Sequence, residues 1–163
     1  MTHCILIGAP VDTGQRRAGC LMGPAAYRTA GIARALEALG HQVSDRGDVT
    51  PAPVAEPPHC PNPAVHHLAE TLGWTQALAR AGQKAMAADG GMPVFMGGDH
   101  SLSLGSVAGV AAHAAAVGRP LFVLWLDAHS DFHTPETTDS GNLHGTPLAY
   151  IIGRPFAPFP PFP

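Results

Sequence analysis

The sequence predicts an α/β fold in which helices cover both faces of a mainly parallel sheet, in three α/β/α layers. Apolar runs of strand length alternate along the chain with longer stretches of helical periodicity, which is typical of such a sheet. Residues 121–126 are apolar at every position, as expected of a strand that is buried on both faces. The 163 residues are enough for one domain with a core of its own.

The expected elements follow from these patterns. We expect strands at residues 5–8, 41–45, 92–96 and 121–126. We expect helices at residues 24–39, 65–86 and 102–117. Pro24 suits a first helical position, and Gly40 ends the same segment. The prolines between residues 50 and 63 predict a loop.

The composition argues against two classes of partner. The net charge is -3 and 13% of the residues are charged, without a run of lysine or arginine, so nucleic acid and anionic membranes are unsuitable partners. No apolar run approaches the length of a membrane span, and the N-terminus lacks a secretory signal pattern. The three cysteines lack metal-type spacing and are expected to be reduced. We therefore expect a cytoplasmic protein.

Polar side chains follow the third and fourth expected strands. His100 ends the sequence GGDH, and Asp127, His129 and Asp131 alternate directly after residues 121–126. The carboxyl ends of parallel strands meet at one edge of the sheet, where ligands bind. Alternate side chains of an extended segment point the same way, so Asp127, His129 and Asp131 are expected to converge. His100 would add an imidazole from the neighbouring strand.

This group of side chains predicts a metal site. Closely spaced carboxylates repel one another unless a divalent cation supplies the opposite charge. Oxygen and nitrogen ligands without thiolate favour Mn, Mg, Zn or Fe, and four or more of them suggest two ions that activate water. Asp99 could orient a ligand imidazole or form the turn. On the alternative interpretation, Asp127 and Asp131 cap a helix or turn and the histidines lie at the surface.

A third polar group, in SGNLHG, contains Ser140, Asn142 and His144. The first two carry neutral hydrogen-bonding groups that can recognise a carboxylate or an amine, and His144 could pass a proton. The same sequence could also be a turn-rich surface loop. His66 and His67 follow the proline loop and are expected to be exposed to solvent.

Together these motifs resemble a known family. GGDHSLS, DAHSDFHTPETT and SGNLHGTP, in this order and spacing, are similar to the ureohydrolases and most closely to arginases, over residues 5–153. The resemblance implies a three-layer α/β/α fold, two Mn(II) ions, and hydrolysis of L-arginine to L-ornithine and urea in arginine metabolism and the urea cycle. It also suggests a homotrimer or homohexamer.

The resemblance implies metal ligands residue by residue. His100, Asp127 and Asp131 match the ligands of one manganese ion, and His129 matches a ligand of the second ion, with Asp127 shared between the two. The family takes further ligands from a later Ser-x-Asp-x-Asp-x-x-Asp-Pro segment. The last aspartate of this sequence is Asp139, so this segment is missing.

The resemblance also implies a substrate site. Ser140 and Asn142 match residues that recognise the substrate α-carboxylate, and His144 matches the histidine that transfers a proton. His133 stands where many arginases carry a substrate-contacting asparagine, and it can still donate a hydrogen bond.

The C-terminal residues depart from the family pattern. We expect residues 1–153 to be the N-terminal part of an arginase-like domain, and residues 154–163 to be a proline-rich tail unrelated to the fold. The fold would then be incomplete and the activity impaired. Two alternatives remain open, namely agmatinase or another ureohydrolase, and a non-catalytic truncated remnant.

Overall fold

The computed structural model describes the whole chain except residues 52, 56–58, 61, 88–90 and 155. Its strands are β1 (His3–Ala9), β2 (Gln42–Asp48) and β3 (Met92–Gly97). Its α-helices are α1 (Gly23–Thr29), α2 (Ile32–Ala38), α3 (Leu68–Ala87), α4 (Leu102–Ala116) and α5 (Pro147–Ile151). Short 3-10 turns occur at η1 (Cys20–Met22) and η2 (Leu143–Gly145).

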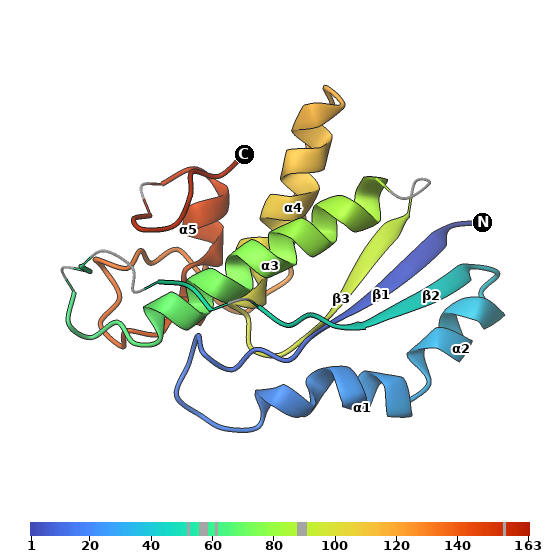
Figure 1. Ribbon diagram of the computed structural model, residues 1–163, viewed down its shortest axis with the longest axis horizontal. Helices are drawn as coiled ribbons and strands as arrows, with labels where there is room; N and C mark the ends of the chain where they lie inside the picture. Colours follow the sequence, from blue (N-terminus) through green and yellow to red (C-terminus); the bar gives the residue numbers. More distant parts are fainter. Residues whose placement is uncertain (52, 56–58, 61, 88–90, 155) are drawn as a thin grey trace.

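The three strands form a parallel sheet in the order β2-β1-β3. The central strand β1 is apolar, and its residues Ile5 and Leu6 are completely buried. Figure 1 shows α1 and α2 on one side of the sheet and α3 on the other, with α4 against α3. This arrangement confirms the expected α/β/α layering with a parallel sheet. No helix in the described ranges has both the length and the apolar character needed to cross a bilayer.

The expected helix at residues 24–39 is divided into α1 and α2. Gly31 lies between them with φ of 86°, a left-handed conformation that ends one helix before the next begins. Pro24 occupies an early position of α1, as expected. The recurrence of apolar residues therefore predicts both helical segments correctly, but it does not predict the break at Gly31.

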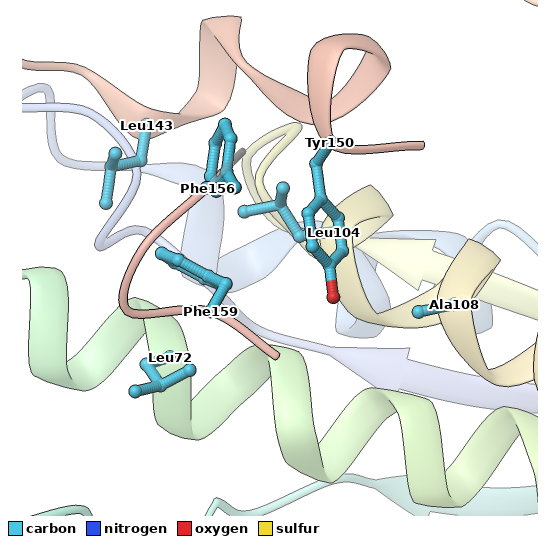
Figure 2. Close-up of a cluster of buried hydrophobic side chains, with 7 residues drawn as sticks. All are labelled: Leu72, Leu104, Ala108, Leu143, Tyr150, Phe156 and Phe159. Carbon is cyan, nitrogen blue, oxygen red and sulfur yellow. The ribbon is translucent and has the colours of Figure 1, made fainter. Parts of the chain in front are cut away.

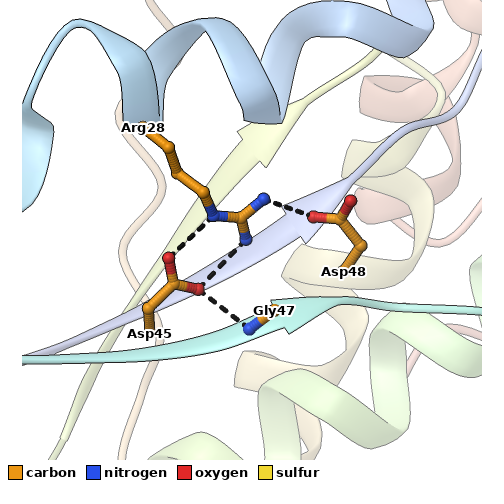
Figure 3. Close-up of polar contacts among 4 residues, drawn as sticks. All are labelled: Arg28, Asp45, Gly47 and Asp48. Atoms are coloured by element: carbon orange, nitrogen blue, oxygen red, sulfur yellow. Dashed lines mark hydrogen bonds and ion pairs between the residues drawn. The ribbon is translucent and has the colours of Figure 1, made fainter.

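An ion-pair network joins α1 to the end of β2 (Figure 3). The Arg28 guanidinium donates from Nε and Nη2 to Asp45 and from Nη1 to Asp48, at 2.6–3.0 Å. Hydrogen bonds from Arg28 and from the backbone N–H of Gly47 hold the pKa of the Asp45 carboxyl below its usual value, against a smaller effect of burial. The two carboxylates in turn raise the pKa of Arg28.

The largest hydrophobic cluster lies between α3, α4, α5 and the residues that follow α5 (Figure 2). Its buried members are Leu72, Leu104, Ala108, Leu143, Tyr150, Phe156 and Phe159. The Tyr150 hydroxyl donates to the carbonyl of Pro160 at 2.8 Å. The proline-rich end of the chain therefore contacts this cluster, while the expected boundary between residues 153 and 154 stays a prediction.

The prediction of a strand at residues 121–126 is wrong. These residues form no strand, and Phe122 and Leu126 are each 86% exposed. An apolar run becomes a buried strand only where a neighbouring strand pairs with its backbone and helices cover its faces. The described sheet consists of β2, β1 and β3, so it offers this segment no pairing strand, and only Val123 and Trp125 on one face are half-buried.

Candidate metal centre

His100 lies just beyond the carboxyl end of β3, before α4. The preceding Asp99 is buried, and its carboxylate accepts hydrogen bonds from the backbone N–H groups of Gly14 (2.9 Å) and Ser101 (2.8 Å). These contacts close the turn and attach it to the loop after β1. Of the two roles considered for Asp99, this geometry supports the turn.

Three of the four expected metal ligands meet at this edge. His100 Nδ1 lies 3.0 Å from Asp127 Oδ2 and 3.1 Å from Asp131 Oδ2. The potential ligand atoms of the three residues all lie within 4.8 Å of one another. They line a cavity of about 470 Å³ together with His129, Ser130, His133, His144 and Gly145. The cavity therefore contains every histidine expected to act on metal or substrate.

The two carboxylates are held in different ways. Asp131 is 7% exposed, and its backbone carbonyl accepts hydrogen bonds from Leu148 and Ala149 in α5. Asp127 Oδ1 accepts a hydrogen bond from the backbone N–H of His129 at 2.8 Å. This hydrogen bond is the largest influence on the pKa of Asp127, and with the nearby imidazole of His100 it lowers that pKa despite the opposing effect of desolvation.

His129 does not join the cluster of ligand atoms. Its side chain is 84% exposed, and its Nδ1 lies 3.4 Å from Asp127 Oδ1 on the other side of that carboxylate from His100 Nδ1, which approaches Oδ2. The chain bends at residues 128 and 129, and Asp131 has φ of 47°. The expectation that alternate side chains converge holds only for a straight extended segment. The bend therefore separates His129 from Asp131.

The donor set fits a divalent cation. Asp131 Oδ2 is buried and has no hydrogen-bond donor within the described part of the chain, since its approach to His100 lacks hydrogen-bond geometry. A buried carboxylate oxygen in this state, next to a second carboxylate, is unfavourable unless a positive charge compensates it. Two carboxylates and one imidazole are a ligand set that suits Mn, Mg, Zn or Fe.

The four expected substrate residues lie in two places. His133 and His144 line the cavity, and the backbone N–H of His144 donates to the backbone carbonyl of Gly14 at 2.9 Å. His133 Nδ1 donates to the carbonyl of Thr137 at 3.1 Å. Ser140 and Asn142 lie in the following loop, where the Asn142 N–H donates to Ser140 Oγ at 3.2 Å.

Two residues contact this region although their sequence pattern does not predict it. His66 was expected to be exposed, but it is half-buried, and its Nε2 lies 2.9 Å from Asn142 Oδ1. Asn62 donates to two carbonyls of residues 135–138. No local pattern signals contacts across more than 70 positions, because only the tertiary fold brings these residues together.

The comparisons with known proteins agree on one family. The model of the arginase family matches residues 2–158. An arginase of Agrobacterium fabrum is 54% identical over 153 residues, which cover 93% of this chain and 46% of that protein. The chain thus spans about half the length of the curated relatives it matches.

Solved structures extend this result to the fold. The arginase from Bacillus caldovelox is 38% identical with a TM-score of 0.80, and the match covers 94% of this chain and 50% of that one. The arginase of Entamoeba histolytica, solved in complex with L-ornithine, is 30% identical with a TM-score of 0.77, over 94% of this chain and 51% of that one. With its motifs, its layered sheet and nearly its whole length matched, this chain belongs to the arginase family.

Proposed function

We propose that this chain carries the manganese-binding and substrate-recognition part of an arginase, which hydrolyses L-arginine to L-ornithine and urea. One observation carries the proposal above the others. His100, Asp127 and Asp131 direct their ligand atoms to one point of a cavity that is also lined by His144. The proposed metal ligands and the proposed proton-transfer group would thereby share one site.

Manganese would be held by His100, Asp127 and Asp131, and a second ion by Asp127 with His129. Family membership supports manganese among the metals that this donor set suits. Bound manganese would supply an activated water, which the guanidinium carbon requires because it is a poor electrophile.

The remaining residues would bind the substrate and move a proton. His144 lines the cavity and would deliver a proton to the departing amine. His133 Nδ1 donates to the carbonyl of Thr137, so Nε2 is the ring nitrogen that would contact the substrate. Ser140 and Asn142 offer groups for an α-carboxylate, and the E. histolytica relative was solved with L-ornithine, an α-amino acid. We further propose a cytoplasmic enzyme that forms a homotrimer or homohexamer.

Two alternatives make different predictions. An agmatinase acts on a substrate without a carboxylate, so Ser140 and Asn142 would have no such group to bind. A non-catalytic remnant is supported by the ligand count, since three of the four expected ligands converge in the described part of the chain. We accordingly expect urea release by this chain to be slower than by a full-length relative.

The metal site is tested by two variants of neighbouring residues. Asp131→Asn removes a converging carboxylate, and Asn tolerates the positive φ of this position. We expect it to weaken Mn(II) binding by at least about a hundredfold, because loss of a direct ligand should cost no less than loss of a residue that supports one. His129→Ala removes only a proposed ligand of the second ion and should weaken binding of the first ion by less than about threefold, because the His129 imidazole lies outside the cluster of the other three ligands. Calorimetric or electron paramagnetic resonance titration measures both.

The reaction is tested on the same proteins. The wild-type chain with Mn(II) should release urea from L-arginine faster than from agmatine, and Asp131→Asn should abolish this release. Equal Mn(II) affinity of the wild type and Asp131→Asn would overturn the metal site. Faster release from agmatine would favour the agmatinase alternative, and Mn(II) binding without any release would favour the remnant.

A further inference from the structure

The loop that carries Ser140 and Asn142 is held by hydrogen bonds to a segment far away in sequence. Asn62 Nδ2 donates to the carbonyls of Pro135 and Thr138, each at 2.8 Å, while Asn62 Oδ1 accepts from the N–H of Ala64 at 2.9 Å. A single amide side chain thus joins the segment before α3 to the loop at two points. Neither Asn62 nor this segment has a part in the proposed chemistry.

The second attachment is a close backbone approach. Gly141 has φ of 72°, and a Cβ at this position would collide with the carbonyl oxygen of Ala64. The loop therefore reaches Ala64 only with glycine at position 141. Arg16 also donates to the Ala64 carbonyl, at 3.2 Å. The residues on either side of Ala64 consequently have a fixed position relative to Asn142.

His66 makes the third contact, directly to a side chain expected to bind substrate. Its Nε2 lies 2.9 Å from Asn142 Oδ1, in a half-buried position. An amide oxygen only accepts hydrogen bonds, so His66 Nε2 must carry the proton. His66 Nδ1 is buried without a hydrogen-bond partner in the described ranges, which fits an unprotonated nitrogen better than a second N–H donor.

We propose that His66 is a positioning residue, which holds the Asn142 amide so that its N–H groups face an incoming carboxylate. The hydrogen bond from His66 occupies the amide oxygen and leaves the Nδ2 donors for another acceptor. A flipped amide would present its oxygen instead, and two acceptors repel one another. The inference rests on the proposed function, because that function supplies a substrate with an α-carboxylate.

The protonation of His66 is tested without metal or substrate. Nitrogen-15 NMR of the metal-free wild-type chain separates a protonated from an unprotonated imidazole nitrogen, and the His66→Gln spectrum identifies the signals of residue 66. We expect a protonated Nε2 and an unprotonated Nδ1 at neutral pH. An unprotonated Nε2 would mean that His66 accepts from Asn142, and it would overturn the proposal.

Two substitutions at position 66 separate positioning from general structural support. His66→Gln places an amide nitrogen near the former Nε2, whereas His66→Asn reaches only as far as Nδ1 and loses the contact. With Mn(II) bound, His66→Asn should weaken L-arginine binding about tenfold, the scale of one hydrogen bond to a charged group. His66→Gln should restore affinity to within about threefold of the wild type. Calorimetry measures each affinity.

Agmatine, which lacks the carboxylate, is the matched control ligand. We expect its affinity to be the same in the wild type and in His66→Asn, because the affected contact is to the carboxylate. An equal loss for agmatine and L-arginine would show that His66 supports only the structure, and would overturn the proposal. Failure of the wild type to bind either ligand would refute the proposed function, while the NMR result would still decide the orientation of the Asn142 amide.

Discussion

Residues 121–126 and residues 156–162 are both apolar and form neither helix nor strand, but their exposure to solvent is opposite. Phe122 and Leu126 are each 86% exposed, although the first segment contains neither glycine nor proline. Phe156 and Phe159 are buried, although the second segment is rich in proline. Composition alone would predict that residues 121–126 are buried and that residues 156–162 are exposed.

The difference lies in the surface that each segment meets. Phe156 and Phe159 contact each other and Tyr150, with ring centroids 5.1–6.0 Å apart, over the apolar faces of α3 and α4 (Figure 2). Such packing needs no backbone ladder, so proline is no obstacle to it. A strand, by contrast, requires a paired neighbour, and the described sheet offers none to residues 121–126. Burial therefore depends on available partners more than on local pattern.

The largest expected effect compares one substitution in the two segments. Phe159→Ala should destabilise the chain by about 3–5 kcal/mol, because it leaves a cavity in the main cluster. Phe122→Ala should change the free energy of unfolding by less than about 0.5 kcal/mol, since its ring contacts mainly solvent. Urea denaturation followed by circular dichroism measures both values.

The same pair of variants also tests the expected boundary of the fold. Equal, small effects of the two substitutions would mean that residues 154–163 are a tail outside the fold, as the sequence suggests. A large effect of Phe122→Ala would show instead that residues 121–126 are covered in solution, and the contrast between the segments would be lost.

Much of the fold could be predicted because its signals are local. The apolar runs of β1 and β3 and the helical periodicity of α3 and α4 lie within single elements, so each could be read from its own residues. The strand at residues 121–126 could not, because pairing depends on residues distant in sequence. The same limit applies to the break at Gly31, where helical periodicity continues across a change in backbone conformation.

At the candidate site, three of the expected ligands converge, but for a different structural reason than the sequence suggests. His100, Asp127 and Asp131 are expected to meet because two strands would end at one edge, but of these two segments only β3 forms a strand. Asp131 is held instead by α5, whose N–H groups bind its carbonyl. The contact between His66 and Asn142 was not foreseen, because 76 positions separate the two residues.

A smaller effect is expected from the hydrogen bond between Tyr150 and the C-terminal segment. Tyr150→Phe keeps the buried ring and removes the hydroxyl that donates to Pro160. We expect a loss of about 1 kcal/mol, because the Pro160 carbonyl loses its donor while the packing is retained. The free energy of unfolding in urea measures the loss.

A double variant tests whether the segment is held as one unit. In the Phe159→Ala background the effect of Tyr150→Phe should shrink, since the two residues contact the same segment. Strict additivity of the two effects would show that the segment is not held as one unit.

The smallest expected effect concerns the network of Arg28 on the far side of the sheet, where the contacts are polar and partly exposed (Figure 3). Asp45→Asn should destabilise the chain by about 0.5 kcal/mol near pH 6, because solvent screens the pair.

The pKa of Asp45 is lowered from its usual value of 3.8 by the hydrogen bonds of Arg28. Its stabilising contribution is therefore complete above pH 3.8 and declines as the pH falls through that value toward the folded-state pKa. The unfolding free energies of the wild type and Asp45→Asn should consequently approach each other between pH 6 and pH 2, as a denaturant series would measure. A difference that stayed constant over this range would show that the charge of Asp45 does not contribute to stability.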